Sequence, residues 1–486
     1  MTRLLRVALA TLSLAAAVGA CATPAPHPLE GTWTGTVTAP QGEAEIGFRF
    51  QHDTAGKLVL TMHMPVMHLY DQVVGPYVEE HEGGYRIPFL DTAWRLEGDT
   101  LTGTFALGRL PMRLTRGGAF SQRPPAFAPP PAAPAVRWSY PLGAPSWASP
   151  VVQDGIVYVG ASDGRFHAVR AQDGTGLWTW SGPHRIDGQA AVDDAAVYFV
   201  DGAVALVCLD RASGAVRWRE PLHDAQIAGG PPKPNPTFNR RTATPLVRDG
   251  VVYAGSTDGG LYAFDARTGA RRWRFAAGAP IHSGIAADGD QLVFGTMDGT
   301  LITLHRDGHE VARAKAGGAI VTTPLLVAGR AIVGARDYQL YAFDRGTGTV
   351  AWRYSYWFSW IESSPQLRDG VVYVGGSDFR RVTAFAPADG RARWSTDVRG
   401  LAWGTPALSE ERVFIGTVAQ RPALLAHEAG LVALDRRTGA VLWRQPAEPP
   451  SADAPMWGYA GSLAVDGDLV IAAGLDGKLI ALPALD

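Results

Sequence analysis

The feature that most constrains the fold of this chain is a phrase that recurs from about residue 135 to residue 486. One copy runs from Val251–Gly255, through an Asp-Gly turn and a second apolar run ending at Asp265, to Thr268-Gly-x-x-x-Trp273. A period of about 40 residues with four strand-like runs is typical of propeller blades. The positions equivalent to Gly255 are Gly160, Val200, Gly295, Gly334, Gly375, Gly416 and Ala473. The repeat therefore predicts an all-β propeller over residues 135–486.

Each part of the phrase has a local role. Asp-Gly pairs such as Asp154-Gly155 suit tight hairpin turns, because both central residues of those turns take a positive φ. A tryptophan follows a glycine by four residues in most copies, as at Gly214 and Trp218. We expect these tryptophans to pack between neighbouring blades. The fourth copy has Ala312 instead, which predicts a more loosely docked blade.

The two ends of the repeat region predict how the ring closes. The last copy stops at Asp486, before its Gly-x-x-x-Trp strand is due. Ala135-Val-Arg-Trp138 repeats Ala215-Val-Arg-Trp218 letter for letter. The N-terminal strand should therefore complete the last blade, which gives eight blades and removes an exposed sheet edge.

These repeats resemble the pyrroloquinoline-quinone (PQQ)-like propeller family. Its members include quinoprotein dehydrogenases, the barrel-assembly lipoprotein BamB and extracytoplasmic sensor modules. Because one fold serves all of these roles, the resemblance does not choose among them.

The N-terminus has the pattern of an export signal. Arg3 and Arg6 precede an apolar run to Val18, too short to span a bilayer comfortably. Val18-Gly-Ala-Cys21 resembles a bacterial lipobox, which implies removal of residues 1–20, lipidation of Cys21 and a tether over 21–28. Ala22 implies sorting to the outer membrane, facing the periplasm; an ordinary signal peptide is the alternative. With Cys21 acylated, the other cysteine, Cys208, has no partner for an intrachain disulfide, and we interpret it as a small buried residue.

A separate β domain is expected over residues 29–118, followed by a proline-rich linker over 119–134. Short alternating or apolar runs separated by Gly and Asp turns predict a small antiparallel β-barrel or sandwich. The opening Gly31-Thr-Trp33 and a closing Arg113 or Arg116 resemble a lipocalin-type barrel, in which a terminal arginine covers the first tryptophan.

Composition and missing motifs narrow the function. A net charge of -2 leaves no basic footprint for nucleic acid, and membrane contact is expected through the lipid anchor only. The chain has no adjacent cysteines and no haem-attachment motif, which argues against a quinoprotein dehydrogenase. No hydrolase elbow, Walker loop or zinc-protease motif is present. PQQ with calcium remains the cofactor of the alternative hypothesis.

The residues that precede the innermost strands are candidates for a ligand site at the channel mouth. We expect these side chains to face the mouth, where they would bind a small polar or aromatic ligand or, alternatively, satisfy one another and ordered water. They are Trp147, Asp187, Arg241, His282, Thr322, Glu362, Trp403 and Tyr459.

Two further clusters stand out. Trp357, Phe358 and Trp360 form an aromatic group that is either a partner-binding surface or a lid over the channel mouth. The segment with Met62, His63, Met64, Met67 and His68 has the ligand types of a copper(I) site, although core methionines with surface histidines are the simpler interpretation.

The sequence thus favours a monomeric, non-enzymatic envelope lipoprotein that binds an envelope protein or small ligand, as BamB-like proteins do in outer-membrane protein assembly. The alternatives are a periplasmic PQQ-dependent oxidoreductase and a quinone or small-ligand sensor.

Overall fold

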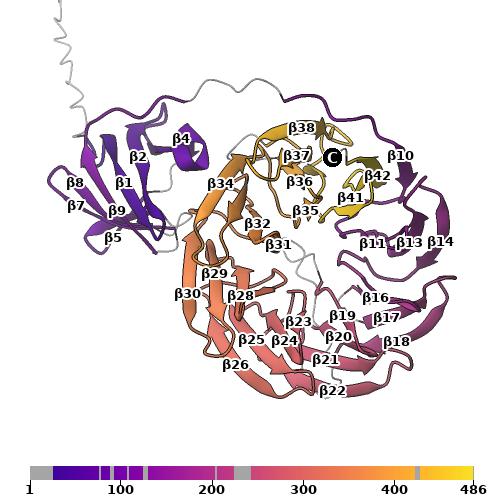
Figure 1. Cartoon of the computed structure of the whole chain (residues 1–486). Helices are drawn as coiled ribbons and strands as arrows, with labels where there is room; N and C mark the ends of the chain where they lie inside the picture. The colour runs from indigo at the N-terminus through magenta and orange to yellow at the C-terminus, as the bar shows by residue number, and fades with distance from the viewer. Residues whose placement is uncertain are drawn as a thin grey trace, which may run out of the picture.

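A computed structural model describes residues 26–75, 78–87, 92–106, 109–123, 130–202, 205–223, 242–421 and 427–484. Its regular elements are strands, apart from one 3-10 turn, η1 (Pro65–Met67). Figure 1 shows a ring of blades with a smaller sheet at its side. Among the described residues, no helix has the length and apolar character needed to cross a bilayer.

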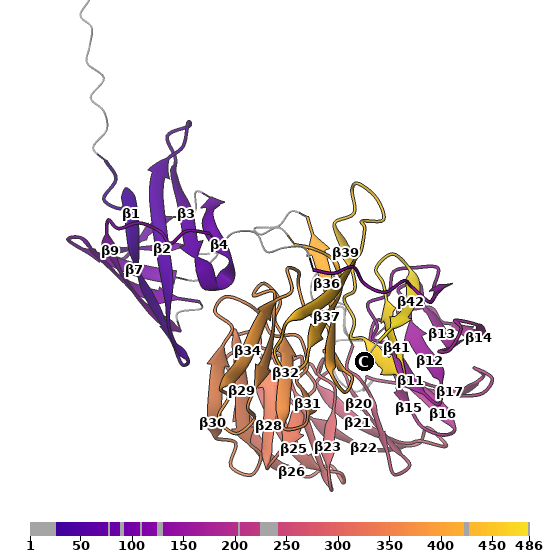
Figure 2. The same cartoon turned by 45° about the horizontal axis from the view of Figure 1, so that its top comes forward.

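The N-terminal domain is a single antiparallel sheet with the order β4-β3-β2-β1-β9-β8-β7-β6-β5. It curls into a half-barrel, visible in Figure 2, around buried aromatic residues that include Trp33, Phe48 and Trp94. The strands are β1 (Gly31–Ala39), β2 (Gly42–His52), β3 (Leu58–Met64), β4 (Leu69–Gly75), β5 (Glu79–His81), β6 (Gly84–Ile87), β7 (Thr92–Glu97), β8 (Thr100–Phe105) and β9 (Leu110–Arg116).

Arg116, and not Arg113, covers the first tryptophan of this sheet. Its guanidinium carbon lies 4.2 Å from the centre of the Trp33 ring. The same group donates to the carbonyl oxygens of Glu30 and Pro28, both at 2.6 Å, and pairs with Asp99 at 2.8 Å. The start of the domain is therefore clamped to its last strand.

The eight-bladed propeller follows, and the prediction of its fold is confirmed. The innermost strands are β11 (Val151–Gln153), β15 (Ala191–Val192), β19 (Leu246–Arg248), β23 (Ala286–Asp288), β27 (Leu325–Val327), β31 (Gln366–Arg368), β35 (Ala407–Leu408) and β40 (Ala464–Asp466). The second strands are β12 (Ile156–Gly160), β16 (Ala196–Asp201), β20 (Val251–Gly255), β24 (Gln291–Gly295), β28 (Arg330–Gly334), β32 (Val371–Gly375), β36 (Arg412–Gln420) and β41 (Leu469–Ala473).

Each blade also has a third strand and an outer strand. The third strands are β13 (Arg165–Arg170), β17 (Ala205–Asp210), β21 (Gly260–Asp265), β25 (Thr300–His305), β29 (Gln339–Asp344), β33 (Arg381–Phe385), β37 (Gly430–Asp435) and β42 (Lys478–Pro483). The outer strands are β14 (Gly176–Ser181), β18 (Val216–Pro221), β22 (Arg271–Ala276), β26 (Glu310–Lys315), β30 (Val350–Ser355), β34 (Ala392–Asp397), β38 (Val441–Pro446) and β10 (Trp138–Pro141). A short strand, β39 (Met456–Gly458), extends the seventh blade by pairing with the end of β36.

The ring closes as its two ends predict. Strand β10 pairs with β42, with Trp138 opposite Ala481, so the start of the repeat region forms the outer strand of the eighth blade. We number blades 1 to 8 by their innermost strands, from β11 to β40.

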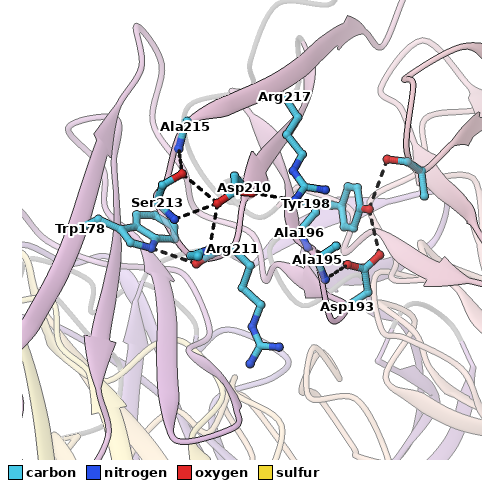
Figure 3. A network of polar contacts seen from close by, with 12 residues as sticks. Trp178, Asp193, Ala195, Ala196, Tyr198, Asp210, Arg211, Ser213, Ala215 and Arg217 are labelled. Carbon is cyan, nitrogen blue, oxygen red and sulfur yellow. Dashed lines mark hydrogen bonds and ion pairs between the residues drawn. The ribbon is translucent and has the colours of Figure 1, made fainter.

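The Asp-x-x-Ser/Thr-Gly part of the repeat folds into a self-contained turn. In blade 2, Asp210 accepts hydrogen bonds from the backbone and hydroxyl of Ser213, at 2.9 and 2.8 Å, and from Arg217 at 2.7 Å (Figure 3). Asp265, Asp344 and Asp435 form the same turn in other blades. The carboxylate satisfies backbone donors that the turn leaves without a partner.

Tryptophans on the outer strands join neighbouring blades through this turn. Trp178 of blade 1 donates from its indole nitrogen to the Arg211 carbonyl of blade 2, at 3.0 Å, and its ring lies against Gly214. Trp218 repeats the pattern with Ala266 and Gly269. The glycine has a positive φ and leaves room for the ring, so each turn serves as a docking site for the preceding blade.

Candidate functional site

A ring of hydroxyl side chains surrounds the central channel where the innermost strands begin. The Thr323 backbone nitrogen donates to the Ser364 hydroxyl at 2.9 Å, and Ser462 donates likewise to Ser149 at 2.9 Å. Each bond joins one blade to a neighbour, and Thr405 to Ser462, at 3.0 Å, adds a further link. The hydroxyls line a cavity of about 540 Å³ together with Asp187, His282 and Glu362. We call the propeller face onto which this end of the channel opens the mouth face.

The two acidic residues predicted for the mouth are each held by an arginine. Asp187 is 1% exposed, forms a close ion pair with Arg185 and accepts from the Ser162 hydroxyl at 2.9 Å. Glu362 pairs with Arg336 at 2.7 Å. Asp187 precedes blade 2 and Glu362 precedes blade 6, so the two carboxylates lie on opposite sides of an eight-bladed ring.

Of the three aromatic residues predicted for the mouth, two stack on each other and one lies in the core. Trp147 and Trp403 stack with ring centres 6.0 Å apart and an interplanar angle of 20°, over a cluster that includes Ala460. The prediction for Tyr459 is wrong: its side chain is buried in the core, where it meets Gly416 in the way that Ile281 meets Gly255. Ala460 therefore takes the mouth position of blade 8, and its small side chain lets the two indoles meet.

Two other residues were predicted to face the mouth. Thr322 is fully buried, and its hydroxyl donates to the Gly334 carbonyl at 3.2 Å, so it holds the innermost strand of blade 5 rather than facing the mouth. Arg241 lies outside the described residues.

The aromatic group at 357–360 is not an exposed surface. Trp357 is 4% exposed, and Phe358 lies 6.0 Å from Phe105 of the N-terminal domain, measured between ring centres. Trp360 is partly buried under Arg336, whose guanidinium carbon lies 4.8 Å from the ring centre. The N-terminal domain of the same chain therefore covers much of this group, and one hydrophobic core continues from the domain into blades 5 and 6.

The methionines of the methionine and histidine segment are core residues, and His63 has other contacts. Met62, Met64 and Met67 are buried in the core of the N-terminal domain. His63 is also buried, stacks on Phe120 with 4.5 Å between ring centres, and lies 3.3 Å from Glu45. Within the described ranges, no three His, Cys, Asp or Glu side chains converge in a way that could hold a metal ion.

Of the two cysteines, only Cys208 lies within the described residues. Cys208 is a buried free thiol in β17, and burial raises its pKa to about 12, so it is in its neutral form at physiological pH. Cys21 lies outside the described residues.

Sequence reasoning missed how the N-terminal domain docks on the mouth face. Arg109 donates to the Gly317 carbonyl at 2.9 Å and lies 3.5 Å from Asp337. His68 lies 3.2 Å from Arg381 and 3.4 Å from Asp397 of blade 6. The domain therefore contacts loops of blades 4, 5 and 6. Arg109 belongs to no motif, and His68 was predicted only as part of the methionine and histidine segment, so the fold alone brings these residues together.

The family model described as "Outer membrane protein assembly factor BamB" matches residues 131–274, 257–357 and 357–486, which together span the whole propeller. The chain belongs to this family.

Several BamB proteins are similar in sequence. The one from Burkholderia pseudomallei is 26% identical over 218 residues, which are 43% of this chain and 56% of that protein. The one from Yersinia pestis is 26% identical over 257 residues, 49% of this chain and 63% of that protein. The chain thus aligns with somewhat more than half the length of these curated relatives.

Other relatives show how widely the fold is used. The quinoprotein alcohol dehydrogenase PedH of Pseudomonas putida is 30% identical over 131 residues, 23% of this chain and 22% of that protein. The crystal structure of BamB from Moraxella catarrhalis has a TM-score of 0.54 at 19% identity, covering 72% of this chain and 98% of that one. The quinohemoprotein alcohol dehydrogenase from Comamonas testosteroni has a TM-score of 0.55 at 17% identity, covering 72% and 76%. These structural likenesses show the fold alone.

The residues that line the channel cavity do not fit the calcium-bound quinone of the alternative hypothesis. A calcium ion takes six to eight oxygen ligands, among which carboxylates are prominent. The carboxylates Asp187 and Glu362 are on opposite blades, and each already faces a guanidinium group. These residues therefore support no redox step in the channel.

Proposed function

We propose that this chain is a non-enzymatic scaffold of the cell envelope that assists outer-membrane protein assembly and meets its partner through the mouth face. The observation that carries the proposal is the BamB family match, which extends over the complete propeller rather than a few blades. The ion pairs of Asp187 and Glu362 also support it. Such pairing suits a rigid surface better than a proton-transfer site, where an acid or base must be ready to react.

Anchoring at the outer membrane, on the periplasmic side, is part of this proposal. It rests on the lipobox-like Val18-Gly-Ala-Cys21 and on the proline-rich linker over residues 119–134. Mass spectrometry of the mature N-terminal peptide tests it. We expect a diacylglycerol-modified Cys21 at the new N-terminus, which Cys21→Ser abolishes, and an unmodified peptide from the wild type would contradict it.

The scaffold role is tested by deletion of the gene in its own host. We expect lower amounts of β-barrel proteins in the outer membrane, restored by the wild-type gene. Unchanged amounts of these proteins, together with an unchanged sensitivity to large antibiotics, would contradict the role.

Calorimetry separates this role from the oxidoreductase and quinone-sensor alternatives. The chain from residue 22 onward is titrated with PQQ in the presence of calcium. The scaffold role predicts no saturable heat, whereas saturable binding at micromolar concentration or tighter would favour the alternatives.

A further inference from the structure

Four arginines gather on the mouth face where blade 6, which the N-terminal domain contacts, meets blade 7. Arg380 and Arg381 lie at the start of β33, Arg399 follows β34, and Arg444 is in β38. Two carboxylates pair with members of this group. Asp397 lies 3.3 Å from Arg380, and Glu428 lies 3.1 Å from Arg399 and 3.6 Å from Arg444. We call these four side chains the arginine cluster.

Arg444 is the most deeply buried member of the arginine cluster. It is 9% exposed, and its Nη2 donates to the Val398 carbonyl. Glu428, its carboxylate partner, is shared with Arg399. Its Nη1 is buried and has no hydrogen-bond partner among the described residues. A buried donor of a charged group without a partner is costly, so this position favours an anion.

Arg381, like Arg444, has too few negatively charged neighbours to neutralise its guanidinium group. Its Nη1 donates to the Ser395 carbonyl at 3.0 Å, and its Nη2 lies 3.2 Å from Nε2 of the uncharged His68. Its buried Nε has no hydrogen-bond partner in the described part of the chain. No carboxylate of the described residues lies within ion-pair distance of it. Two guanidinium groups of the arginine cluster are therefore incompletely neutralised.

The electrostatic environment agrees with this geometry. Burial lowers the pKa of Arg444 and of Arg381, and Arg380 lowers both further. Burial and the charge of Arg380 also lower the pKa of His427 to about 4, so this histidine adds no charge at neutral pH. An anion placed among these side chains would raise the pKa values of the two arginines again.

We infer that the arginine cluster binds a phosphate-type oxyanion, with Arg444 and Arg381 as its principal donors. The planar guanidinium presents paired N–H groups that match the oxygens of a phosphate. A phosphate monoester carries about -1.5 to -2 charges at pH 7, which suits two under-neutralised arginines better than a single carboxylate does. The anion is either free in solution or the headgroup of a lipid. This inference does not depend on the proposed function.

Calorimetry of the full soluble chain with inorganic phosphate tests whether the site binds a free anion. Chloride at equal ionic strength is the reference. We expect saturable binding that also raises the melting temperature, since a ligand of the native state stabilises it. Arg444→Gln should weaken this binding by roughly tenfold or more, the loss expected for a charge-assisted contact. Arg345→Gln is the matched control: Arg345 also has buried nitrogens without hydrogen bonds, yet it pairs with Asp288 at 2.6 Å, outside the arginine cluster.

Flotation with phosphatidic acid vesicles tests the lipid source, with phosphatidylcholine vesicles as the reference. Binding to the phosphatidic acid vesicles without binding of free phosphate assigns the site to a headgroup. Arg381→Gln serves as the second variant if Arg444→Gln does not fold. The inference is overturned if the wild type binds neither probe, or if the folded variants bind as tightly as the wild type.

Discussion

The side-chain amide of Gln41 forms two hydrogen bonds with the backbone of Ser355. Its Nε2 donates to the Ser355 carbonyl at 2.8 Å, and the Ser355 nitrogen donates to its Oε1 at 3.1 Å. The turn between β1 and β2 is thereby joined to the end of β30 in blade 5. The N-terminal domain is thus held on the mouth face by directional bonds as well as by its shared core.

Replacing Gln41 with alanine should loosen this contact. Two hydrogen bonds contribute about 1–3 kcal/mol in total, so we expect faster hydrogen exchange at the Ser355 amide and little change in the blades. Exchange followed by mass spectrometry measures this directly. Gln51→Ala, at the exposed end of β2, is the control and should change nothing at Ser355. An unaltered Ser355 amide in Gln41→Ala would contradict the docked arrangement.

Docking of the blades through tryptophan predicts a difference between two glycines with the same backbone conformation. Gly214 and Gly250 both have φ near +72°, but an added Cβ would lie 2.7 Å from the Trp178 ring at Gly214 and would meet nothing within 4 Å at Gly250. Gly250→Ala should cost about 1 kcal/mol for the backbone conformation alone. Gly214→Ala should cost about 1–3 kcal/mol more, because the Trp178 ring must move.

Urea denaturation of the two variants measures this difference. Equal free energies of unfolding would contradict the packing of the Trp178 ring against Gly214.

Docking of the N-terminal domain should weaken in acid because of His68. Burial lowers the pKa of His68 to about 4; Asp397 opposes the shift, and Arg381 and Arg380 add to it. An undocked His68 takes up a proton below its ordinary pKa of about 6.5, whereas the docked form resists protonation until about pH 4. The contribution of His68 to docking is therefore complete above pH 6.5 and is lost as the pH falls towards 4.

Small-angle scattering at pH 7 and pH 5 measures whether the domain stays docked. We expect a larger radius of gyration at pH 5, and a smaller increase in His68→Gln. The same increase in both proteins would assign the effect to other groups.

The ring of blades could be predicted from the sequence, but the surface of the mouth face only in part. Residues 135–138 copy residues 215–218, and the prediction that this segment completes the last blade is confirmed by the pairing of β10 with β42. Ser-Pro or Thr-Pro pairs such as Ser149-Pro150 and Thr405-Pro406 mark where innermost strands begin. The position that faces the mouth is nevertheless one residue away from the predicted one at Tyr459. An error of one residue exchanges a buried position for one that faces the channel.

Contacts between distant segments carry no such local signal. Trp357 belongs to an aromatic group of the kind found in exposed binding surfaces. It is nevertheless buried, because the N-terminal domain packs beside it. Arg381, Arg399 and Arg444 come from three separate segments. Their proximity follows from the arrangement of blades 6 and 7, which no spacing in the sequence encodes.

The clamp at the start of the N-terminal domain gives a further prediction. Arg116→Ala removes the contact with Trp33 and the bonds to two carbonyls, so it should destabilise that domain by roughly 2–4 kcal/mol. Arg113→Ala is the control, because Arg113 lies on the same strand with an exposed side chain. Thermal unfolding followed by tryptophan fluorescence compares them, and an equal effect of both variants would contradict the clamp.

Site-specific photo-crosslinking in living cells tests whether the protein meets its partner through the mouth face. A photoreactive residue is placed at His184 or Gly278, in exposed mouth-face loops, and at Asp194 or Asp290, in exposed turns at the opposite ends of the strands. We expect crosslinks from positions 184 and 278 to a component of the outer-membrane protein assembly machinery, identified by mass spectrometry, and none from 194 and 290. Crosslinks only from the opposite face, or none to that machinery, would contradict it.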